Sequence, residues 1–400
     1  MGGDPLMPPA PVRRPRARDL GIRIGRLDPG PLNAITDVAG LRVGHTTLIA
    51  GNGPLVRGQG PIRTGVTVIL PHDGRIGADP LFAGYHVLNG NGEMTGLAWI
   101  GESGLLTTPV AITNTHSVGV VRDALIAHQL DRHGDDLATA WSLPVVAETW
   151  DGFLNDINGM HVKPEHLFAA LDSASDQLPA EGCVGGGTGM ICHGFKGGTG
   201  TSSRLLRAER GGWTIGALVQ ANYGQRELLR IDGVPVGREL GPEAVPLPGL
   251  PAAGGGGSII VVLATDAPLL PHQCRRLAQR ATLGIARMGG LGEDSSGDIF
   301  LAFSIANRGL AGSRDGLAPL SVRMLPNQAL SPLFEAAADA TEEAIVNALC
   351  AATTMIGIDG HVAHELPLDG LTAAMRRYGR VPAPWGGMHA DERVREDPRS

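Results

Sequence analysis

The chain has 400 residues, with 33 Lys and Arg against 40 Asp and Glu, a formal net charge of −7 and 42% hydrophobic residues. This composition is typical of a globular protein and is long enough for one large domain or two ordinary ones. The mildly negative charge argues against nucleic acid or an anionic membrane as a partner, and no apolar run reaches transmembrane length.

Both ends of the chain are expected to be disordered. Residues 1–20 are rich in Pro and Arg, and residues 386–400 end in the charged run DERVREDPRS, so neither segment carries the apolar residues of a packed core. The Arg13–Arg14 pair is not followed by an apolar segment, which argues against an export signal and makes the cytoplasm the expected location. Between these tails, residues 21–385 are expected to form one domain.

The cysteine pattern argues against a disulfide framework or a zinc site. There is no C-x-x-C pair, and reduced structural thiols are the default for scattered cysteines. The four cysteines are Cys183, Cys192, Cys274 and Cys350.

Strands are indicated by short β-branched runs bounded by Gly, Pro or Asn, and helices by helical spacing between capping residues. In chain order we expect strands at 65–71, 97–100 and 108–115, a helix at 117–134, strands at 144–150, 213–222 and 258–266, a helix at 271–290, a strand at 298–307, and helices at 331–353 and 369–379. Several strands are apolar on both faces, so both faces should be covered. This pattern predicts sheets covered by helices in a layered α/β arrangement, and it is too irregular for a (β/α)₈ barrel.

Four glycines, Gly254 to Gly257, run directly into Ser258 at the start of an apolar strand. If the bond between Gly257 and Ser258 were broken, the serine would carry a free α-amine, with a pKa of ~8, beside its own hydroxyl. Such an amine would serve as general base for the hydroxyl without a histidine. Glycine before the serine permits the contorted backbone that internal attack requires. The glycines alone leave open a flexible loop before an ordinary strand.

Eight segments in chain order resemble the self-cleaving serine aminopeptidases, the family of L-aminopeptidase/D-esterase-amidases and β-peptidyl aminopeptidases. Each segment alone is a weak signal, but the eight together are specific and span nearly the whole expected domain. They are NAITDVAGLRVGHTT (33–47), NGNGEMTGLAWIGESG (89–104), TNTHSVG (113–119), VVAETWDGFLNDING (145–159), GGGTGMICHGFKGGTGTSSR (185–204), VQANYG (219–224), GGGGSIIVVLATDAPL (254–269) and SSGDIFLAFSIAN (295–307).

The resemblance implies a four-layer α/β/β/α sandwich, similar to the N-terminal-nucleophile hydrolases but with different connectivity. It implies cleavage between Gly257 and Ser258 into chains 21–257 and 258–385 that stay associated, and a homo-oligomer of the cleaved unit. Ser258 would be the nucleophile, first in self-cleavage and then toward the substrate. The implied reaction removes a small N-terminal residue from a short peptide, amide or ester, without metal or cofactor.

The resemblance also assigns roles around Ser258. Ser296 and Asp298 match a Ser-x-acid pair, in which the Ser296 hydroxyl holds Ser258 and the carboxylate orients the network. Some relatives carry Glu where this chain has Asp298, so the contact must shift or use water. Asn222 matches an oxyanion donor, and the loss of one such donor lowers a rate by ~10²–10³. Each residue also has a plain structural interpretation: Asn222 as a turn former and Asp298 as an exposed acid before a strand.

Two further residues complete the implied site. The family carries Tyr as a second oxyanion donor where this chain has Trp150, whose indole N–H donates hydrogen bonds only. Activity with altered substrate reach is favoured, and a weakened site or a purely structural Trp150 stays open. Glu148 is implied to bind the substrate ammonium, and as a buried carboxylate it should have a hydrogen-bonded or cationic partner even when empty.

Other motifs are weaker. The segment 185–204 contains neither phosphate-binding glycine pattern, so we interpret it as a close-packed loop that shapes the cleft. A functional Lys196 stays open, but a structural or solvated Lys196 is favoured. No G-x-S-x-G elbow is present, and HVAHE at 361–365 matches no zinc motif and is interpreted as a loop. Two alternatives remain: a self-cleaving acyltransferase of related fold, which usually carries Thr in place of Ser258, and a non-catalytic relative marked by Trp150.

Overall fold

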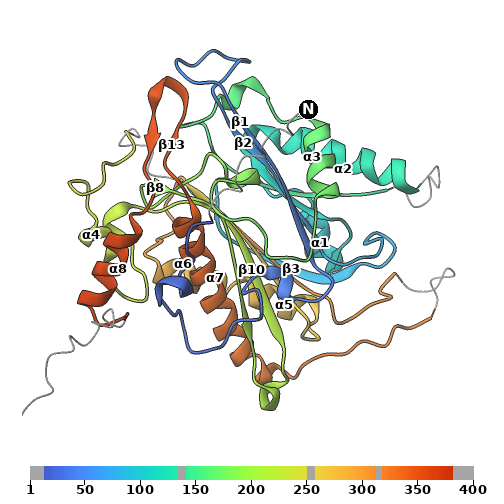
Figure 1. Ribbon diagram of the computed structural model, residues 1–400. Helices are drawn as coiled ribbons and strands as arrows, with labels where there is room; N and C mark the ends of the chain where they lie inside the picture. The colour runs from blue at the N-terminus through green and yellow to red at the C-terminus, as the bar shows by residue number, and fades with distance from the viewer. Residues whose placement is uncertain (1–12, 134–140, 250–256, 312–317, 382–400) are drawn as a thin grey trace, which may run out of the picture.

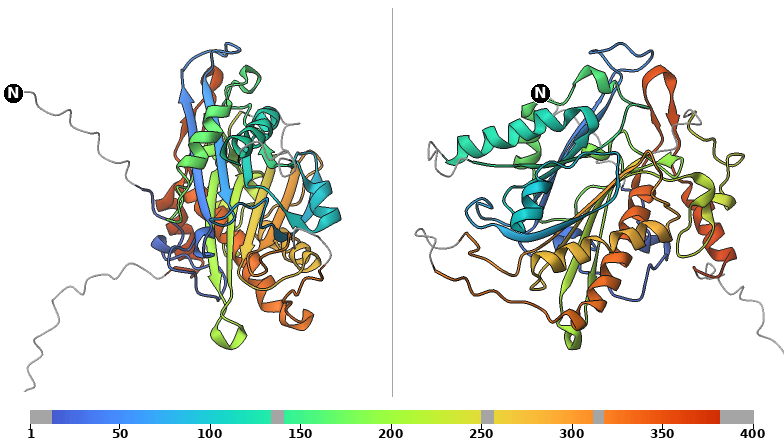
Figure 2. Two further views of the ribbon diagram at one scale, coloured as in Figure 1. Left: turned by 90° about the vertical axis from the view of Figure 1, so that its right-hand side faces the viewer. Right: turned by 180° about the vertical axis from the view of Figure 1, so that it is seen from behind.

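The computed structural model describes residues 13–133, 141–249, 257–311 and 318–381, and its two main sheets are covered by helices (Figures 1 and 2). The smaller sheet has the order β1-β2-β5-β6, with strands β1 Arg42–Ala50, β2 Ile62–Leu70, β5 Val110–Asn114 and β6 Val145–Thr149. The larger sheet has the order β4-β3-β12-β11-β10-β9, with strands β3 Leu81–Gly90, β4 Leu105–Leu106, β9 Gly198–Leu205, β10 Thr214–Asn222, β11 Ser258–Thr265 and β12 Gly297–Ser304.

Shorter elements and helices complete the fold. Two small hairpins pair β7 Ile191–Cys192 with β8 Phe195–Lys196, and β13 Met355–Ile356 with β14 Val362–Ala363. The helices are α1 Leu97–Ser103, α2 Val118–His133, α3 Pro164–Asp172, α4 Val236–Glu239, α5 Pro271–Ala278, α6 Ala281–Arg287, α7 Ser331–Ala351 and α8 Leu368–Arg377. Within the described residues, no helix has both the length and the apolar character to cross a membrane.

Three apolar clusters fill the spaces between four layers. Along β11, Ile259, Val261 and Leu263 pack toward α5, α6 and α7, whereas Ile260, Val262 and Ala264 pack toward the smaller sheet. This alternation follows from the two-residue period of a strand, and it explains why the segment is apolar on both faces. A third cluster lies between the smaller sheet and the pair α2 and α3. The four-layer α/β/β/α sandwich is therefore confirmed.

Strands β1 and β3 and helix α3 were not expected from the sequence, and residues 362–363, expected to lie in a loop, form strand β14. Three further segments differ from the sequence-based expectations. Residues 97–100, expected as a strand, begin helix α1, because Gly96 and Gly104 take left-handed conformations that cap a single short helix. The helix expected at 271–290 is two helices, α5 and α6, separated at Gln279–Arg280. The segment 185–204, expected as a loop, contains the two short strands β7 and β8 and most of edge strand β9.

The N-terminal segment is also more ordered than its composition suggests. Residues 13–20, expected to belong to a disordered tail, are held to the domain by arginines: Arg16 pairs with Glu181 at 2.7 Å and Arg18 pairs with Glu343 at 2.8 Å. Pro- and Arg-rich segments lack apolar groups, but here buried carboxylates on other elements supply the partners. The expected tails at 1–12 and 386–400 lie outside the described residues.

Candidate active site

Three neighbouring strands bring the expected catalytic residues together at one end of the larger sheet. Ser258, the first residue of β11, lies opposite Asn222 in the antiparallel β10–β11 pair. Its neighbour Ile259 lies opposite Asp298 in the parallel β11–β12 pair. Ser258, Asn222 and Asp298 are all buried. Residues from three distant parts of the sequence therefore meet because β11 is central and starts where β10 ends.

The hydroxyl of Ser258 is held by the turn before β12. Its Oγ accepts a hydrogen bond of 3.0 Å from the backbone N–H of Gly297. The Ser296 hydroxyl is hydrogen-bonded to the carbonyl oxygen of Gly257, and the same Oγ lies 2.6 Å from Oδ1 of Asp298. Oδ1 of Asp298 also accepts the N–H of Ile259 at 3.2 Å. Ser296 thus touches the carbonyl of the residue that precedes the expected nucleophile.

Burial raises the pKa of the Asp298 carboxyl to about 6, against the lowering effect of its hydrogen bonds from Ser296 and Ile259. The negative charge of Glu293, in the turn before β12, adds to this rise. Unlike an exposed Asp, this carboxyl gains and loses its proton close to neutral pH. A group of this kind at a buried serine is typical of a catalytic site.

Asn222 is fixed at both ends of its side-chain amide. Its Oδ1 accepts the N–H of Ile191 at 2.8 Å, and its Nδ2 donates to the carbonyl oxygen of Trp150 at 3.0 Å. An amide nitrogen carries two hydrogens, so one remains for another acceptor. The position of Asn222 beside Ser258 agrees with the donor role that the sequence implies, and that role stays a prediction.

Trp150 lies just beyond the end of β6 and is 45% exposed. Its ring covers Gly152, where an added Cβ would fall 2.8 Å from the indole Nε1, so a larger residue at position 152 would displace the ring. Within the described residues the indole N–H makes no hydrogen bond, whereas the backbone carbonyl of Trp150 accepts from Asn222. The indole is therefore accessible to an incoming group, and its part as an oxyanion donor stays a prediction.

Glu148 is buried and has the partners that its burial requires. One oxygen accepts the N–H of Glu93 at 2.9 Å, and the other is hydrogen-bonded to the Thr115 hydroxyl. Burial nevertheless raises its pKa above the usual range. A Cβ built on Gly92 would lie 3.3 Å from Oε1 of Glu148 and 2.9 Å from Cα of Gly297. The carboxylate is therefore separated by one glycine from the residue that holds Ser258.

The sequence itself matches a known family over most of its length. The pattern of Peptidase family S58 covers residues 33–363. The chain belongs to peptidase family S58. It is accordingly a hydrolase, a serine aminopeptidase, and the resemblance noted from its eight segments is confirmed.

Relatives of this S58 peptidase agree over nearly full length. A β-peptidyl aminopeptidase, BapA, from Sphingosinicella microcystinivorans is 50% identical over 383 residues, which cover 94% of this chain and 95% of that protein. The solved structure of a β-aminopeptidase from Burkholderia sp. has 56% identity and a TM-score of 0.84, covering 92% of this chain and 100% of the other. The L-aminopeptidase D-Ala-esterase/amidase from Ochrobactrum anthropi, described as a variant of the Ntn hydrolase fold, has 46% identity and a TM-score of 0.83, covering 92% of this chain and 100% of its own.

Lys196 is a residue of this peptidase whose importance the sequence did not reveal. It is completely buried, and its ammonium donates to the carbonyl oxygens of Met190 at 2.8 Å and Gly197 at 2.9 Å. The residue after Met190 is Ile191, whose N–H holds Asn222. The structural interpretation of Lys196 is therefore correct and the solvated one is wrong. Its rarity was the available signal, because the chain has only one other lysine, Lys163.

Asp151, next to Trp150, was not singled out from the sequence. It is buried, with Oδ1 accepting from Asn155 at 3.0 Å, while Oδ2 has no hydrogen-bond partner in the described part of the chain. Burial raises its pKa to about 7, although hydrogen bonds from Thr64 and Asn155 oppose that rise.

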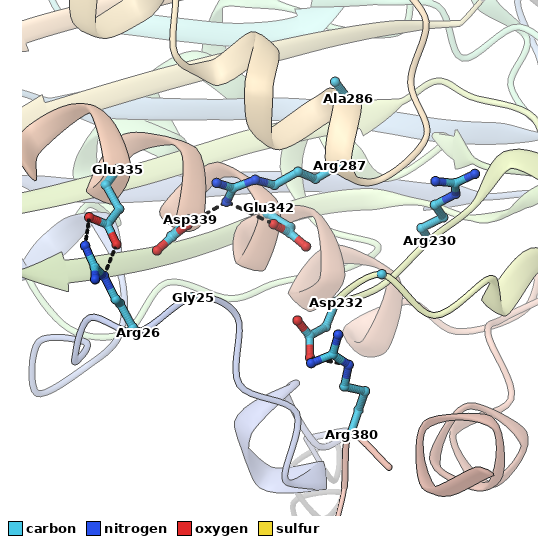
Figure 3. Close-up of a pocket in the computed structure, with 11 residues that line it drawn as sticks. Gly25, Arg26, Arg230, Asp232, Ala286, Arg287, Glu335, Asp339, Glu342 and Arg380 are labelled. Carbon is cyan, nitrogen blue, oxygen red and sulfur yellow. Dashed lines mark hydrogen bonds and ion pairs between the residues drawn. The ribbon is translucent and has the colours of Figure 1, made fainter. Parts of the chain in front are cut away.

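A cavity of about 650 Å³ lies elsewhere, between the N-terminal segment, α6 and α7 (Figure 3). Several of the charges that line it are paired: Arg26 with Glu335 at 2.5 Å and Arg287 with Asp339 at 2.6 Å. None of the expected site residues lines it. Among the described residues there is also no cluster of three or more His, Cys, Asp or Glu side chains suited to a metal ion. All four cysteines are free thiols.

Proposed function

We propose that this chain cuts its own Gly257–Ser258 bond and then releases small N-terminal residues from short peptides, amides or esters through an acyl-enzyme on Ser258. The observation that carries the proposal is the arrangement around the bond. The Ser258 hydroxyl is held by the N–H of Gly297 at 3.0 Å, and the carbonyl of Gly257 is hydrogen-bonded to Ser296. A strand that only packs in the core does not require two serine hydroxyls and a carboxyl gathered around the carbonyl group of the residue before it.

After the cut, the α-amine of Ser258 would lie beside its own hydroxyl. With a pKa of ~8, this amine takes the hydroxyl proton as Oγ attacks the substrate carbonyl, and it returns the proton to the leaving amine. Water then attacks the resulting ester, releases the acyl group as a carboxylic acid and restores the hydroxyl. Ser296 and Asp298 orient the amine, and they stabilise its positive charge while it holds the proton.

The negative charge on the substrate oxygen needs hydrogen-bond donors. The second hydrogen of the Asn222 amide and the N–H of Trp150 are the donors that we assign, since the first Asn222 hydrogen is taken by the carbonyl of Trp150. Trp150 is half-exposed, so its ring has room to turn toward the bound acyl group. The backbone carbonyl of Trp150 holds the Asn222 amide in place, while the indole N–H of Trp150 donates to the substrate oxygen.

Glu148 supports an aminopeptidase specificity. Its carboxylate is already supplied with two hydrogen bonds and lies close to Gly297, so a substrate ammonium would gain a buried partner next to Ser258. Relatives named as β-peptidyl aminopeptidase and β-aminopeptidase share 50% and 56% identity with this chain. We therefore include N-terminal β-residues among the proposed substrates. The cytoplasmic location and the homo-oligomer stay predictions.

The test combines intact mass with a substrate panel. The unchanged chain should separate under denaturing conditions into two fragments divided before Ser258, and Ser258→Ala should stay whole and inactive. The panel holds p-nitroanilides of L-alanine, D-alanine and β-alanine, with hydroxylamine added in parallel to detect acyl transfer. Efficient cutting of the Ser258→Ala chain would show that Ser258 is not the nucleophile. Preferred formation of the hydroxamate over the free acid would favour an acyltransferase instead.

A further inference from the structure

One carboxyl oxygen in the cavity between the N-terminal segment, α6 and α7 has no hydrogen-bond donor among the described residues. The Glu342 side chain, on α7, is only 5% exposed, and its Oε2 lies 3.4 Å from Nη1 of Arg287. The same Nη1 is closer to Oδ1 of Asp339, at 2.6 Å. Oε1 of Glu342 accepts no hydrogen bond from the described part of the chain, and Figure 3 shows this oxygen pointing away from Arg287 toward the open part of the cavity. A buried carboxylate oxygen in this position favours a ligand that brings a donor.

The charge around Glu342 is negative. Burial raises the pKa of its carboxyl to about 7, and the negative charges of Asp339 and Asp232 add to this rise, while Arg287 opposes it. The nearest cation to Asp232 is Arg380, at 3.6 Å. Glu342 and Asp339 therefore share one arginine, and a cation beside Oε1 of Glu342 would balance the remaining charge.

An ammonium group suits this place better than a metal ion. Among the described residues, no three His, Cys, Asp or Glu side chains are grouped to hold a metal. An ammonium carries three N–H donors, which serve carboxylate oxygens on more than one side. Arg26, on the wall of the same cavity, is held by both oxygens of Glu335 at 2.5 and 2.9 Å, so it is not free to supply the donor that Glu342 lacks.

A positive charge without a partner lies at another edge of the cavity. Arg230 lines the cavity and is exposed, and its guanidinium forms no hydrogen bond or ion pair with the described residues. Figure 3 shows Arg230 apart from the group formed by Glu342, Arg287 and Asp339. A free guanidinium binds a carboxylate through two parallel hydrogen bonds. The described part of the cavity thus offers one partner for each end of a zwitterion.

We propose that this cavity is a second binding site that takes a small amino acid as its zwitterion, with the ammonium on Glu342 and the carboxylate on Arg230. The volume of about 650 Å³ lies within the range of small-molecule sites and leaves room for water around such a ligand. This site is independent of the proposed function, because Ser258 and its partners do not line the cavity. Small amino acids are also products of the proposed reaction, so the peptidase would meet such a ligand during turnover.

The site is built from both sides of the Gly257–Ser258 bond. Arg230 precedes this bond in the chain, whereas Glu342 follows it. A molecule that joins Arg230 to Glu342 would therefore contact both fragments of a cut chain. Since a ligand that binds only the folded form stabilises it by mass action, we expect the amino acid to raise the midpoint of thermal unfolding.

The experiment measures the binding of β-alanine by isothermal titration calorimetry at pH 8, where the Glu342 carboxyl is mostly ionised. All chains carry Glu148→Gln, so that the ammonium site proposed beside Ser258 is disabled. We expect one molecule bound per chain. Glu342→Gln and Arg230→Gln should each weaken binding by at least ~10-fold, because each removes one charge-assisted contact. Arg230 is exposed, so its replacement leaves the core intact, and circular dichroism checks that the Glu342→Gln chain is folded.

Two simpler probes and two control variants assign the ends of the ligand. Ethylamine has only the ammonium, so its binding should respond to Glu342→Gln alone. Propionate has only the carboxylate, so its binding should respond to Arg230→Gln alone. Glu209→Gln and Arg210→Gln make the same charge changes at exposed positions outside the cavity, and both should bind β-alanine as the parent does.

Three outcomes would overturn the proposal. The first is the absence of β-alanine binding in the parent Glu148→Gln chain. The second is binding that is unchanged in Glu342→Gln or in Arg230→Gln, because the zwitterion then lacks the contact at that end. The third is ethylamine binding as tight as that of β-alanine, which would exclude recognition of the carboxylate by Arg230.

Discussion

Gly257 lies against the backbone of Asn222 so closely that a Cβ added to it would fall 1.6 Å from the Asn222 carbonyl oxygen. Only glycine fits, because no side chain moves aside when the obstacle is a backbone atom. We predict that Gly257→Ala displaces the bond before Ser258 and slows self-cleavage by at least ~10²-fold, since a misplacement of about 1 Å has that effect on positioned reactions. Intact mass during expression measures the fraction cut.

A matched control is available in the same segment. Gly249 has no atom within 4 Å of an added Cβ, so Gly249→Ala should cut as the unchanged chain does. If Gly257→Ala were cut as fast as Gly249→Ala, the close approach to Asn222 would have no part in the reaction.

Glu148 is predicted to read the charge of the substrate. Glu148→Gln keeps an oxygen that accepts from the N–H of Glu93 and gains an amide N–H that can donate to the Thr115 hydroxyl, but it removes the negative charge. The kcat/KM for an aminoacyl p-nitroanilide should therefore fall by ~10²-fold, equivalent to about 3 kcal/mol for a charge-assisted bond. The ester of the same acid without its amino group serves as control and should be unaffected. Equal losses on both substrates would show that Glu148 supports the fold of the site instead.

Trp150 is predicted to donate through its indole N–H. Trp150→Phe keeps an aromatic ring over Gly152 but removes the donor, so kcat should fall by ~10²–10³-fold while KM changes little. Trp150→Tyr restores a donor and should keep or improve turnover. Equal activity of the Phe and Tyr variants would exclude the donor role and show that Trp150 contributes only packing or substrate fit.

Lys196 is predicted to act through Asn222. Lys196→Met removes the ammonium that binds the carbonyls of Met190 and Gly197, which loosens the turn whose Ile191 N–H holds the Asn222 amide. We expect kcat to fall at least tenfold while KM stays within about twofold, because the donor serves the transition state rather than the bound substrate. The exposed Lys163 provides the control, and Lys163→Met should match the unchanged chain. A change confined to KM would contradict this positioning role.

Asp151 is predicted to make stability fall as pH rises. The folded chain keeps a proton on Asp151 up to about pH 7, whereas the unfolded chain releases it near pH 3.8. Between these values the native state binds more protons, so the free energy of unfolding decreases with increasing pH. Asp151→Asn lacks this dependence, and its stability relative to the parent should increase by on the order of 3 kcal/mol between pH 5 and 8.

Urea unfolding of the uncut Ser258→Ala chain, with and without Asp151→Asn, gives this comparison without the complication of two fragments. A stability difference that is constant with pH would mean that Asp151 is ionised in the folded state throughout the range.

Strands could be predicted from the sequence wherever a short segment is apolar on both faces, as in β11, because such a segment is typical of a strand covered on both sides. The sequence was ambiguous at 97–100, where four apolar residues fit a strand or one helical turn, and the glycine caps at Gly96 and Gly104 decide for the helix. Residues 13–20 were missed for a different reason. Their order depends on Glu181 and Glu343, more than 150 residues away, and composition does not report such partners.

The candidate site divides in the same way. Ser258, Asn222 and Asp298 were found from local patterns and the resemblance, and strand register brings them together. Lys196 and Asp151 were not assigned parts because their importance lies in complete burial, and neither the spacing nor the type of a charged residue reveals burial. The Trp150 carbonyl also escaped notice, since backbone acceptors leave no trace in a sequence.

The order of strands in the larger sheet has a consequence for the two halves that a cut would create. Strands β11 and β12 come from the later half, yet they lie between β3 and β10 from the earlier half. In addition, Arg18 of the earlier half forms an ion pair with Glu343 of the later half. Cleavage of one peptide bond would therefore create a new N-terminus without releasing a fragment. The two fragments could separate only if the β3–β12 and β10–β11 strand pairs were both broken. Self-cleavage would change the connectivity of the polypeptide but not the arrangement of its strands and helices.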